Sequence, residues 1–209
     1  MEKKDFILAS ASPYRLALLE QVALCPKLVC PADIDESCLR FETPSRYVKR
    51  MALEKARRVA ALHPGENVLA CDTVVVVGRR ILHKAGSDEE QTRVMRLVSG
   101  RASHVLSAVC LINKNGREAL RFSDSRVLTK RLSEEDIRNY VATGEWKGCS
   151  GYKIEGRFAG FVRCIRLWKK AKSSMCRNLT CTFCSSGART TSRCWTAHIK
   201  GLPTRTFTA

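Results

Sequence analysis

The fold is decided by the stretch Asn67-Val-Leu-Ala-Cys-Asp-Thr-Val-Val-Val-Val77. Most of its residues are apolar at consecutive positions, and valine dominates its second half. A strand that is apolar on both faces is typical of the centre of a sheet covered on both sides. Gly78-Arg79 then predicts a turn into a short partner strand at Ile81-Leu82. The chain is therefore expected to build a mixed α/β domain around this strand.

Upstream of this strand, the pattern predicts two strands and two helices. Residues 6–9 are a short apolar run, and a helix follows that begins at Pro13, where the missing N–H of proline costs nothing. A second strand is expected at residues 28–32. A long helix is expected at residues 44–62, ended by His63-Pro-Gly65. Its apolar stripe consists of Val48, Ala52, Ala56 and Val59.

Downstream, the pattern alternates again. Ser87-Asp-Glu-Glu90 predicts a capping box that opens a helix ending at Gly100. Strands are expected at residues 104–113 and 118–129, joined by the hairpin turn Lys114-Asn-Gly116. Ser133 caps a further short helix that is closed by Gly144, and a last strand is expected at residues 158–167. No internal repeat is visible in the sequence.

The charge divides the chain into two parts. Its 209 residues include 37 Lys and Arg against 20 Asp and Glu, for a net charge of +17. Residues 1–166 hold 29 of the basic and all 20 acidic residues, whereas residues 167–209 hold 8 basic residues, no acid, and 13 Ser and Thr. We therefore predict one domain at 1–166 and an atypical basic, Ser/Thr/Cys-rich tail at 167–209. A frame change near codon 167 or a lineage-specific extension would produce such a tail.

Composition also excludes several classes of protein. No run approaches the roughly 20 apolar residues of a membrane span, and the N-terminus carries acids and reaches a polar loop within ten residues, unlike a signal peptide. The cysteines of residues 1–166 lack the spacing of a disulfide framework and are expected to be reduced thiols. The expected location is therefore the cytoplasm. A charge of +17 suits a nucleic-acid binder, but no basic run is interleaved with aromatic residues and no known binding motif is present.

The loop Ser10-Ala-Ser-Pro-Tyr-Arg15 has the composition of an anion site. It lies between a predicted strand and a helix N-terminus, where hydroxyls, backbone N–H groups and the helix dipole favour a bound phosphate. Arg15 would add a forked donor. Taken alone, this loop is equally typical of an ordinary serine N-cap, and that explanation is the simpler one.

Further candidates surround the central strand. Asp72 is a carboxylate in an apolar strand, which is costly unless it is paired, bound to a metal or at an open end. Lys55 and Lys84 add cations, and the segment Asp33-Ile-Asp-Glu36 offers the oxygen ligands that hard cations prefer. Each of these lysines and loop acids alone is better explained as a solvated side chain. Together, they describe a site for a metal-bound polyphosphate.

These residues lie in motifs that resemble the Maf proteins, nucleoside triphosphate pyrophosphatases once called septum formation inhibitors. The motifs follow in family order over about residues 6–166. They are Ile7-Leu-Ala-Ser-Ala-Ser-Pro-Tyr-Arg15, Leu18-Leu-Glu20, Asp33-Ile-Asp-Glu36, Tyr47-Val48, Ala52-Leu-Glu-Lys-Ala56, Cys71-Asp-Thr-Val-Val75, Leu97-Val-Ser-Gly100, Leu132-Ser-Glu-Glu-Asp-Ile137, Tyr140-Val-Ala-Thr-Gly-Glu145 and Gly151-Tyr-Lys-Ile-Glu-Gly156.

The resemblance implies both a fold and an activity. The fold would be an elongated, two-lobed α/β structure with a mixed sheet and flanking helices, like that of inosine triphosphate pyrophosphatases, and usually a homodimer. The activity would be hydrolysis of a nucleoside triphosphate to the monophosphate and pyrophosphate with a divalent cation, Mg or Mn. A non-catalytic nucleotide-binding protein and a basic nucleic-acid-binding protein are the alternatives. The retained Asp72 argues against the first of these.

The resemblance also assigns roles by position. Asp72 is the expected proton acceptor that activates the attacking water, and Glu36 and Asp72 are the expected metal ligands. The expected substrate-binding residues are Ser12, Arg15, Lys55 and Lys84.

Three positions tied to base selectivity in the family are Tyr14, Thr73 and Glu155 in this chain. Members that prefer dTTP and UTP usually have Arg, Thr and Gln there, and members that prefer 7-methyl-GTP usually have Trp, Gln and Glu. This chain matches neither set. A ring at Tyr14 would stack on a base and Glu155 would accept from a guanine-type edge; simple packing of the tyrosine is the alternative.

Overall fold

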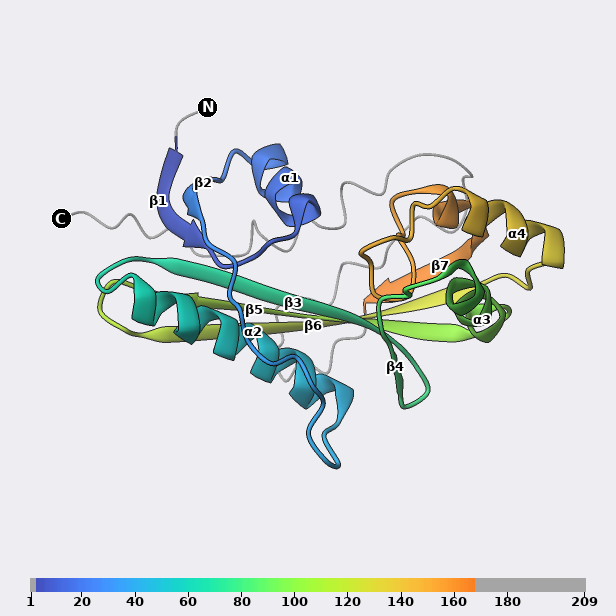
Figure 1. Cartoon of the computed structure of the whole chain (residues 1–209), viewed down its shortest axis with the longest axis horizontal. Coiled ribbons are helices and arrows are strands. Elements are labelled where there is room, and N and C mark those ends of the chain that lie inside the picture. The colour runs from blue at the N-terminus through green and yellow to red at the C-terminus, as the bar shows by residue number, and fades with distance from the viewer. Residues whose placement is uncertain (1–2, 168–209) are drawn as a thin grey trace. The chain divides into compact units, whose positions relative to one another are not determined.

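A computed structural model describes residues 3–167, so all but the first residue of the predicted tail lies outside the described residues. The chain divides into the units Met1–Ser174 and Met175–Ala209. The described residues, which are coloured in Figure 1, belong to the first. The strands are β1 (Lys3–Leu8), β2 (Cys25–Val29), β3 (Val68–Val77), β4 (Arg80–Leu82), β5 (Ala102–Ile112), β6 (Glu118–Thr129) and β7 (Val162–Leu167). The helices are α1 (Pro13–Gln21), α2 (Pro44–Leu62), α3 (Asp88–Val98) and α4 (Glu134–Ala142), with a 3-10 turn at Arg157–Phe161.

The strands form one mixed sheet with flanking helices, which confirms the predicted α/β class. Six of them follow the order β2-β1-β3-β5-β6-β7, and the short β4 pairs with β3 off this path. β3 is parallel to β1 and antiparallel to β4 and β5. The predicted central strand is therefore the one that joins the parallel and antiparallel parts of the sheet.

Several predicted strand boundaries were wrong by three or four residues, and β1 begins at Lys3 rather than at residue 6. β2 begins at Cys25 rather than at residue 28, because its first residues pair with β1. The last strand begins at Val162, since residues 157–161 form a 3-10 turn. That turn buries Phe158 completely, with its ring stacked on Tyr152 at a centroid distance of 3.8 Å.

The helix caps follow the predicted residues with one difference. Ser133 forms a complete capping box with Asp136 at the start of α4. At α3, Ser87 accepts from the backbone N–H of Glu90, but the Glu90 carboxylate accepts from Gly86 instead of Ser87. The predicted capping box at Ser87 is thus only half formed.

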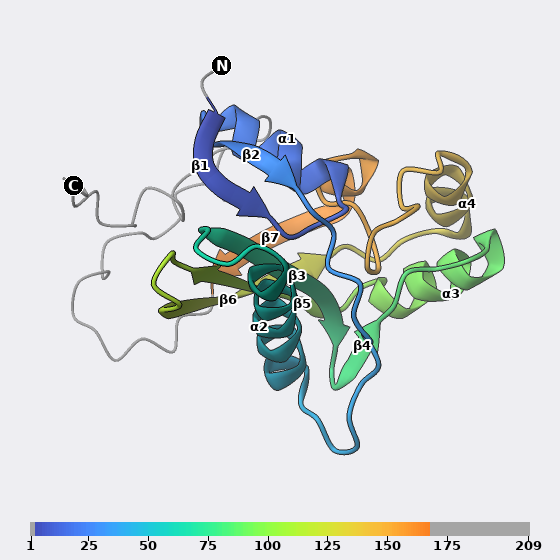
Figure 2. The same ribbon diagram turned by 60° about the vertical axis from the view of Figure 1, so that its left-hand side comes forward.

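The core consists of two hydrophobic clusters that use different faces of the sheet. Because successive residues of a strand point to opposite faces, Val74 and Val76 of β3 pack under α2 and Val75 packs with α3 and α4. The predicted stripe of α2 (Val48, Ala52, Ala56 and Val59) is fully buried. Figures 1 and 2 show α2 beside one half of the long strands, and α3 with α4 beside the other half.

Two expectations drawn from composition can be compared with the described residues. No disulfide joins the cysteines of residues 3–167 to one another. None of their helices combines the length and the apolar character that crossing a bilayer requires.

Candidate active site

One edge of β3 is interrupted at its middle. β1 pairs with this edge at Val68 and Leu69, and β4 pairs with it from Val75 to Val77. Within the described part of the chain, no strand pairs with this edge at residues 70–74, and we call this interval the sheet-edge gap. The backbone N–H of Ala9 donates to the Leu69 carbonyl at 2.8 Å on one side of it. On the other side, the Val75 N–H donates to Ser150 Oγ at 3.3 Å.

A buried ion pair lies on the strand at this gap. Lys55 Nζ, from α2, lies 2.8 Å from Asp72 Oδ1 and 2.7 Å from Glu36 Oε1. Lys55 and Asp72 are only 7% and 6% exposed, whereas the Glu36 side chain is 51% exposed. A buried carboxylate is tolerated when an opposite charge pairs with it. The ammonium of Lys55 therefore compensates for the burial of the Asp72 carboxylate in the apolar strand.

The other expected cations, Arg15 and Lys84, lie within electrostatic reach of Glu36. Burial raises the pKa of Glu36, but the hydrogen bond from Lys55 and the charges of Lys55, Lys84 and Arg15 outweigh it and hold that pKa below its usual value. In the sequence, Arg15 comes before residues 70–74 and belongs to α1, and Lys84 comes after them, two residues beyond the end of β4. The structure thus gathers three cations from separate elements around Glu36.

The loop before α1 is organised by a serine that the sequence did not single out. Ser10 is 5% exposed, and its Oγ accepts from Arg15 Nη1 at 2.9 Å and from the Ser12 N–H at 3.2 Å. Ser12 is the N-cap residue, but its side chain makes no capping hydrogen bond. Ser12 thus occupies the N-cap position that the simpler explanation predicts, and its role toward a phosphate stays a prediction.

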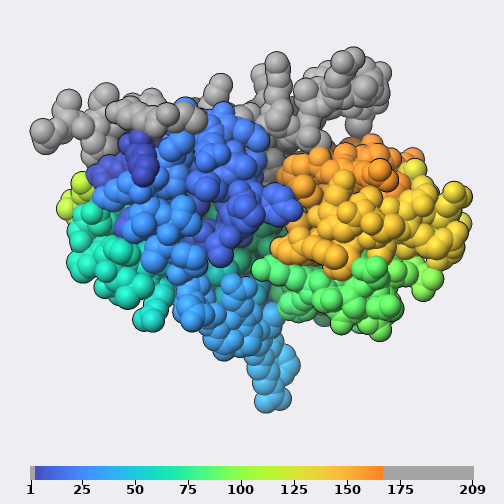
Figure 3. Space-filling view, turned by 45° about the horizontal axis from the view of Figure 1, so that its top comes forward, coloured from blue at the N-terminus to red at the C-terminus, as the bar shows by residue number. Residues whose placement is uncertain are grey.

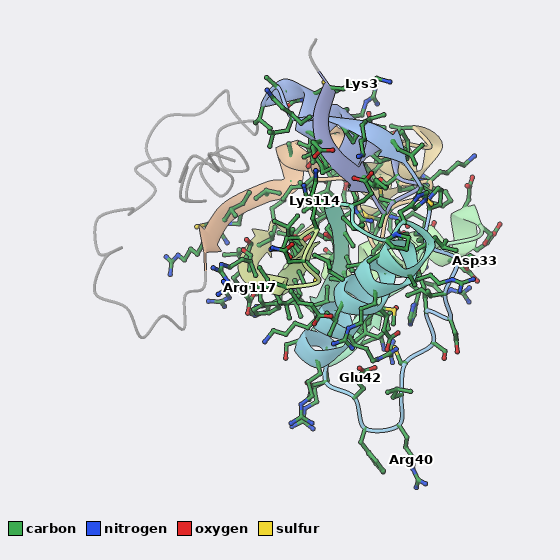
Figure 4. The ribbon with its side chains drawn as sticks, turned by 90° about the vertical axis from the view of Figure 1, so that its left-hand side faces the viewer. Lys3, Asp33, Arg40, Glu42, Lys114 and Arg117 are labelled. Atoms are coloured by element: carbon green, nitrogen blue, oxygen red, sulfur yellow. The ribbon has the colours of Figure 1, made fainter. Side chains whose placement is uncertain are left out.

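Two side chains of α2 hold the acidic segment. The Tyr47 hydroxyl donates to the Glu36 carbonyl at 2.8 Å, and Arg50 Nη2 donates to the Ser37 carbonyl at 2.9 Å. Burial, followed by the charges of Asp72 and Glu36, raises the pKa of Tyr47 to about 12, so the hydroxyl keeps its proton. The loop continues to Arg40, which lies at its tip (Figure 4).

The remaining acids of this segment do not join the ion pair. Asp35 accepts from the backbone N–H and the hydroxyl of Ser37, at 2.9 and 2.8 Å, within its own turn. Asp33 is exposed. Of the acidic segment, only Glu36 therefore remains a candidate to hold a cation together with Asp72.

The segment 148–156 closes the other side of the gap and is firmly held. Gln91, 1% exposed, donates from Nε2 to the Gly151 carbonyl at 2.8 Å. Ser150 donates to the Leu82 carbonyl, and the Lys153 N–H donates to the Tyr140 hydroxyl at 3.1 Å. These contacts attach the segment to β4, α3 and α4.

The three expected selectivity residues come from three elements. Tyr14 is 43% exposed, and Lys153 Nζ lies 4.7 Å from its ring centroid. In Figure 3 the blue surface of the first residues meets the orange surface that includes this segment. Thr73 faces the side of β3 opposite to Asp72, and its hydroxyl lies 3.1 Å from Ser107 Oγ. Glu155 is exposed and acts electrostatically on Cys149.

The carboxylates suit a metal shared with a substrate. Glu36 and Asp72 lie close together, because both contact one ammonium group. No group of three or more His, Cys, Asp or Glu side chains among residues 3–167 is arranged to hold a metal ion. Mg²⁺ in enzymes is usually held by one or two carboxylates together with substrate phosphates and water. The donor set of this chain fits that arrangement.

Four contributors were given no individual role from the sequence: Ser10, Tyr47, Gln91 and Lys153. A signal existed for two of them. Tyr47 precedes Lys55 by eight residues and so lies on the same helix face. Gln91 is a polar residue one turn before the buried Met95. Ser10 and Lys153 act through contacts that the sequence pattern does not show.

Comparison with known proteins gives the following similarities. A family model described as Maf-like protein matches residues 5–168. A dTTP/UTP pyrophosphatase of Caulobacter vibrioides is 52% identical over 157 residues, which cover 75% of this chain and 81% of that protein. One of Zymomonas mobilis is 48% identical over 160 residues, 76% of this chain and 79% of that protein.

Solved structures are similar at a lower level. The nucleoside-triphosphatase / dITP/XTP pyrophosphatase of Mycobacterium abscessus is 24% identical, with a TM-score of 0.42 over 63% of this chain and 74% of that one. The Ham1 protein of Staphylococcus aureus is 15% identical, with a TM-score of 0.44 over 60% and 72%.

Proposed function

The chain belongs to the Maf-like protein family, and from this premise we propose that it hydrolyses nucleoside triphosphates to nucleoside monophosphate and pyrophosphate. The observation that carries the proposal is the buried Lys55, which bridges Asp72 and Glu36 at the sheet-edge gap. The relatives that are about half identical to it are named dTTP/UTP pyrophosphatases. We therefore propose dTTP and UTP as its substrates.

The cations of the site suit a triphosphate. Arg15, Lys55 and Lys84 approach from three elements and act on one carboxylate. A triphosphate carries several negative charges, and fixed cations stabilise the charge that develops as the phosphoanhydride bond breaks. Ser12, at the helix N-terminus, would add a hydroxyl and backbone N–H groups for the same oxygens.

Asp72 is proposed as the proton acceptor. A water molecule bonds to the α-phosphorus, its proton passes to an Asp72 carboxylate oxygen, and the bond to the β-phosphate oxygen breaks so that pyrophosphate leaves with the electron pair. Glu36 and Asp72 would hold the Mg or Mn ion, which would supply positive charge to the phosphates. Lys55 helps to hold the pKa of Glu36 below its usual value and, by contacting both carboxylates, keeps Glu36 and Asp72 close together.

Tyr14, Thr73 and Glu155 are proposed to contact the base. A homodimer in the cytoplasm is proposed by analogy with the family.

The test is pyrophosphate release from UTP, dTTP and the other nucleoside triphosphates with Mg²⁺ or Mn²⁺. Asp72→Asn is expected to lower the turnover by a factor of about 100 or more, the usual contribution of a general base. The matched control is Asp124→Asn, because Asp124 pairs with His104 at 2.8 Å on β5 and β6. Full activity in Asp72→Asn would refute the assigned role.

The same assay separates the alternatives. Nucleotide binding without pyrophosphate release would favour a non-catalytic binding protein. Salt-dependent binding to DNA without turnover would favour the nucleic-acid binder.

A further inference from the structure

Lys153 places a cation on an aromatic ring beside the proposed site. Its Nζ lies 4.7 Å from the ring centroid of Tyr14, which is 43% exposed on α1. The two residues come from opposite sides of the sheet-edge gap, one from the helix that follows β1 and one from the segment 148–156. Neither the reaction nor the binding of phosphate, as proposed above, uses Lys153.

The backbone of Lys153 is fixed by the second hydrophobic cluster. Its N–H donates to the hydroxyl of Tyr140, which is 1% exposed. Two residues earlier, the Gly151 carbonyl accepts from the buried Gln91. The Lys153 ammonium therefore extends toward Tyr14 from a backbone that buried Tyr140 and Gln91 hold in place. A group that recognises a substrate needs such a fixed position.

The cations of the site fall into two groups, one that acts on Glu36 and one near Cys149 that includes Lys153. The cations that lower the pKa of Glu36 are Lys55, Lys84 and Arg15. Lys153 acts on Cys149, together with Glu155 and Lys84. Lys84 contributes to both effects, and its backbone forms an isolated bridge with Ser150. An exposed aromatic ring beside a cation offers stacking area and hydrogen-bond donors, which suit a nucleobase better than a phosphate.

The chemistry of the ammonium limits which base it accepts. Lysine only donates hydrogen bonds, so it favours a keto oxygen and disfavours an exocyclic amino group. Uracil and thymine carry a keto oxygen at C4, where cytosine carries an amino group. We propose that Lys153 is a specificity-determining residue that donates to a keto oxygen of the base, beside the ring of Tyr14, and so favours uracil and thymine nucleotides over cytosine nucleotides. This inference rests on the proposed function.

The experiment compares kcat/KM for UTP and CTP in the wild type and in Lys153→Met. A charged hydrogen bond to the base is expected to contribute a factor of about ten or more. The UTP-to-CTP ratio should therefore fall about tenfold in Lys153→Met and remain near the wild-type ratio in Lys153→Arg. The matched control is Lys147→Met, which removes an ammonium that lies 5.9 Å from the Trp146 ring in the same part of the chain. Its ratio should not change.

Two outcomes overturn the inference while leaving the proposed function intact. Equal loss for UTP and CTP would make Lys153 a phosphate ligand, and an unchanged ratio would remove it from recognition altogether. Binding of UMP and CMP, measured by calorimetry, tests the same preference without turnover. If the wild type released no pyrophosphate, the proposed function would fail, whereas a UMP preference lost in Lys153→Met would still support the role of Lys153. If the wild type bound UMP no more tightly than CMP, the proposed role of Lys153 would be overturned.

Discussion

Lys55→Met is expected to destabilise the protein by removing the partner of a buried charge. Lys55 and Asp72 are 7% and 6% exposed and lie 2.8 Å apart. Removing one member of a buried pair costs about 3–5 kcal/mol, because the other charge is left unpaired. Glu36 is half exposed, so solvent reaches this site from one side. We therefore expect the lower end, about 3 kcal/mol, which is a large part of the 5–15 kcal/mol by which ordinary domains are stable.

The measurement is the free energy of unfolding from urea titrations, followed by circular dichroism in a buffer with a chelator. Lys49→Met, on the same helix, is the control. It removes an ammonium that lies 4.5 Å from the Phe122 ring, and should cost no more than about 1 kcal/mol. Lys55→Met/Asp72→Asn should be more stable than Lys55→Met alone, because the amide carries no charge. A loss below about 1 kcal/mol in Lys55→Met, or no recovery in the double variant, would refute the reasoning.

Two further variants test how the segments around the site are held. Tyr47→Phe removes the donor to the Glu36 carbonyl and should cost about 1 kcal/mol in urea unfolding, with a higher KM for the nucleotide–metal complex; an unchanged KM would show that this hydrogen bond does not position Glu36. Gly151→Ala meets both a φ of +78° and a Cβ contact of 3.1 Å with Leu82, so its melting temperature should fall further than that of Gly148→Ala, which shares the φ of +78° but has open space around its Cβ. Equal shifts in the two glycine variants would contradict the packing argument.

The features that the sequence predicted correctly are those that depend on local periodicity. The apolar run at β3 and the stripe of α2 each specify a strand or a helix and the face that it buries. The buried Asp72 was found as an exception within such a run. Its cost in an apolar strand required a partner, and the structure supplies Lys55.

The features that the sequence did not predict depend on residues far apart in the chain. Tyr14 and Lys153 are 139 positions apart in sequence, and no local pattern relates them. The same is true of Gln91 and Gly151. The 3-10 turn before β7 was not predicted, because the apolar pattern of its residues is typical of a strand. The stacking of Phe158 on Tyr152 stabilises the helical turn instead. Tertiary contacts decide these positions, and they overrule local preference.

The sheet-edge gap also bears on aggregation. Leu69 and Val75 direct their backbone groups toward this edge, and by alternation Cys71 and Thr73 do the same. Backbone groups without a strand partner invite the strand of another molecule, and natural proteins deter such pairing with charged side chains. Arg15 and Lys84 act on the carboxylate beside this interval, so an incoming strand would have to displace water from their charges. Two of the cations that suit a triphosphate would thus also oppose pairing with a strand of another molecule.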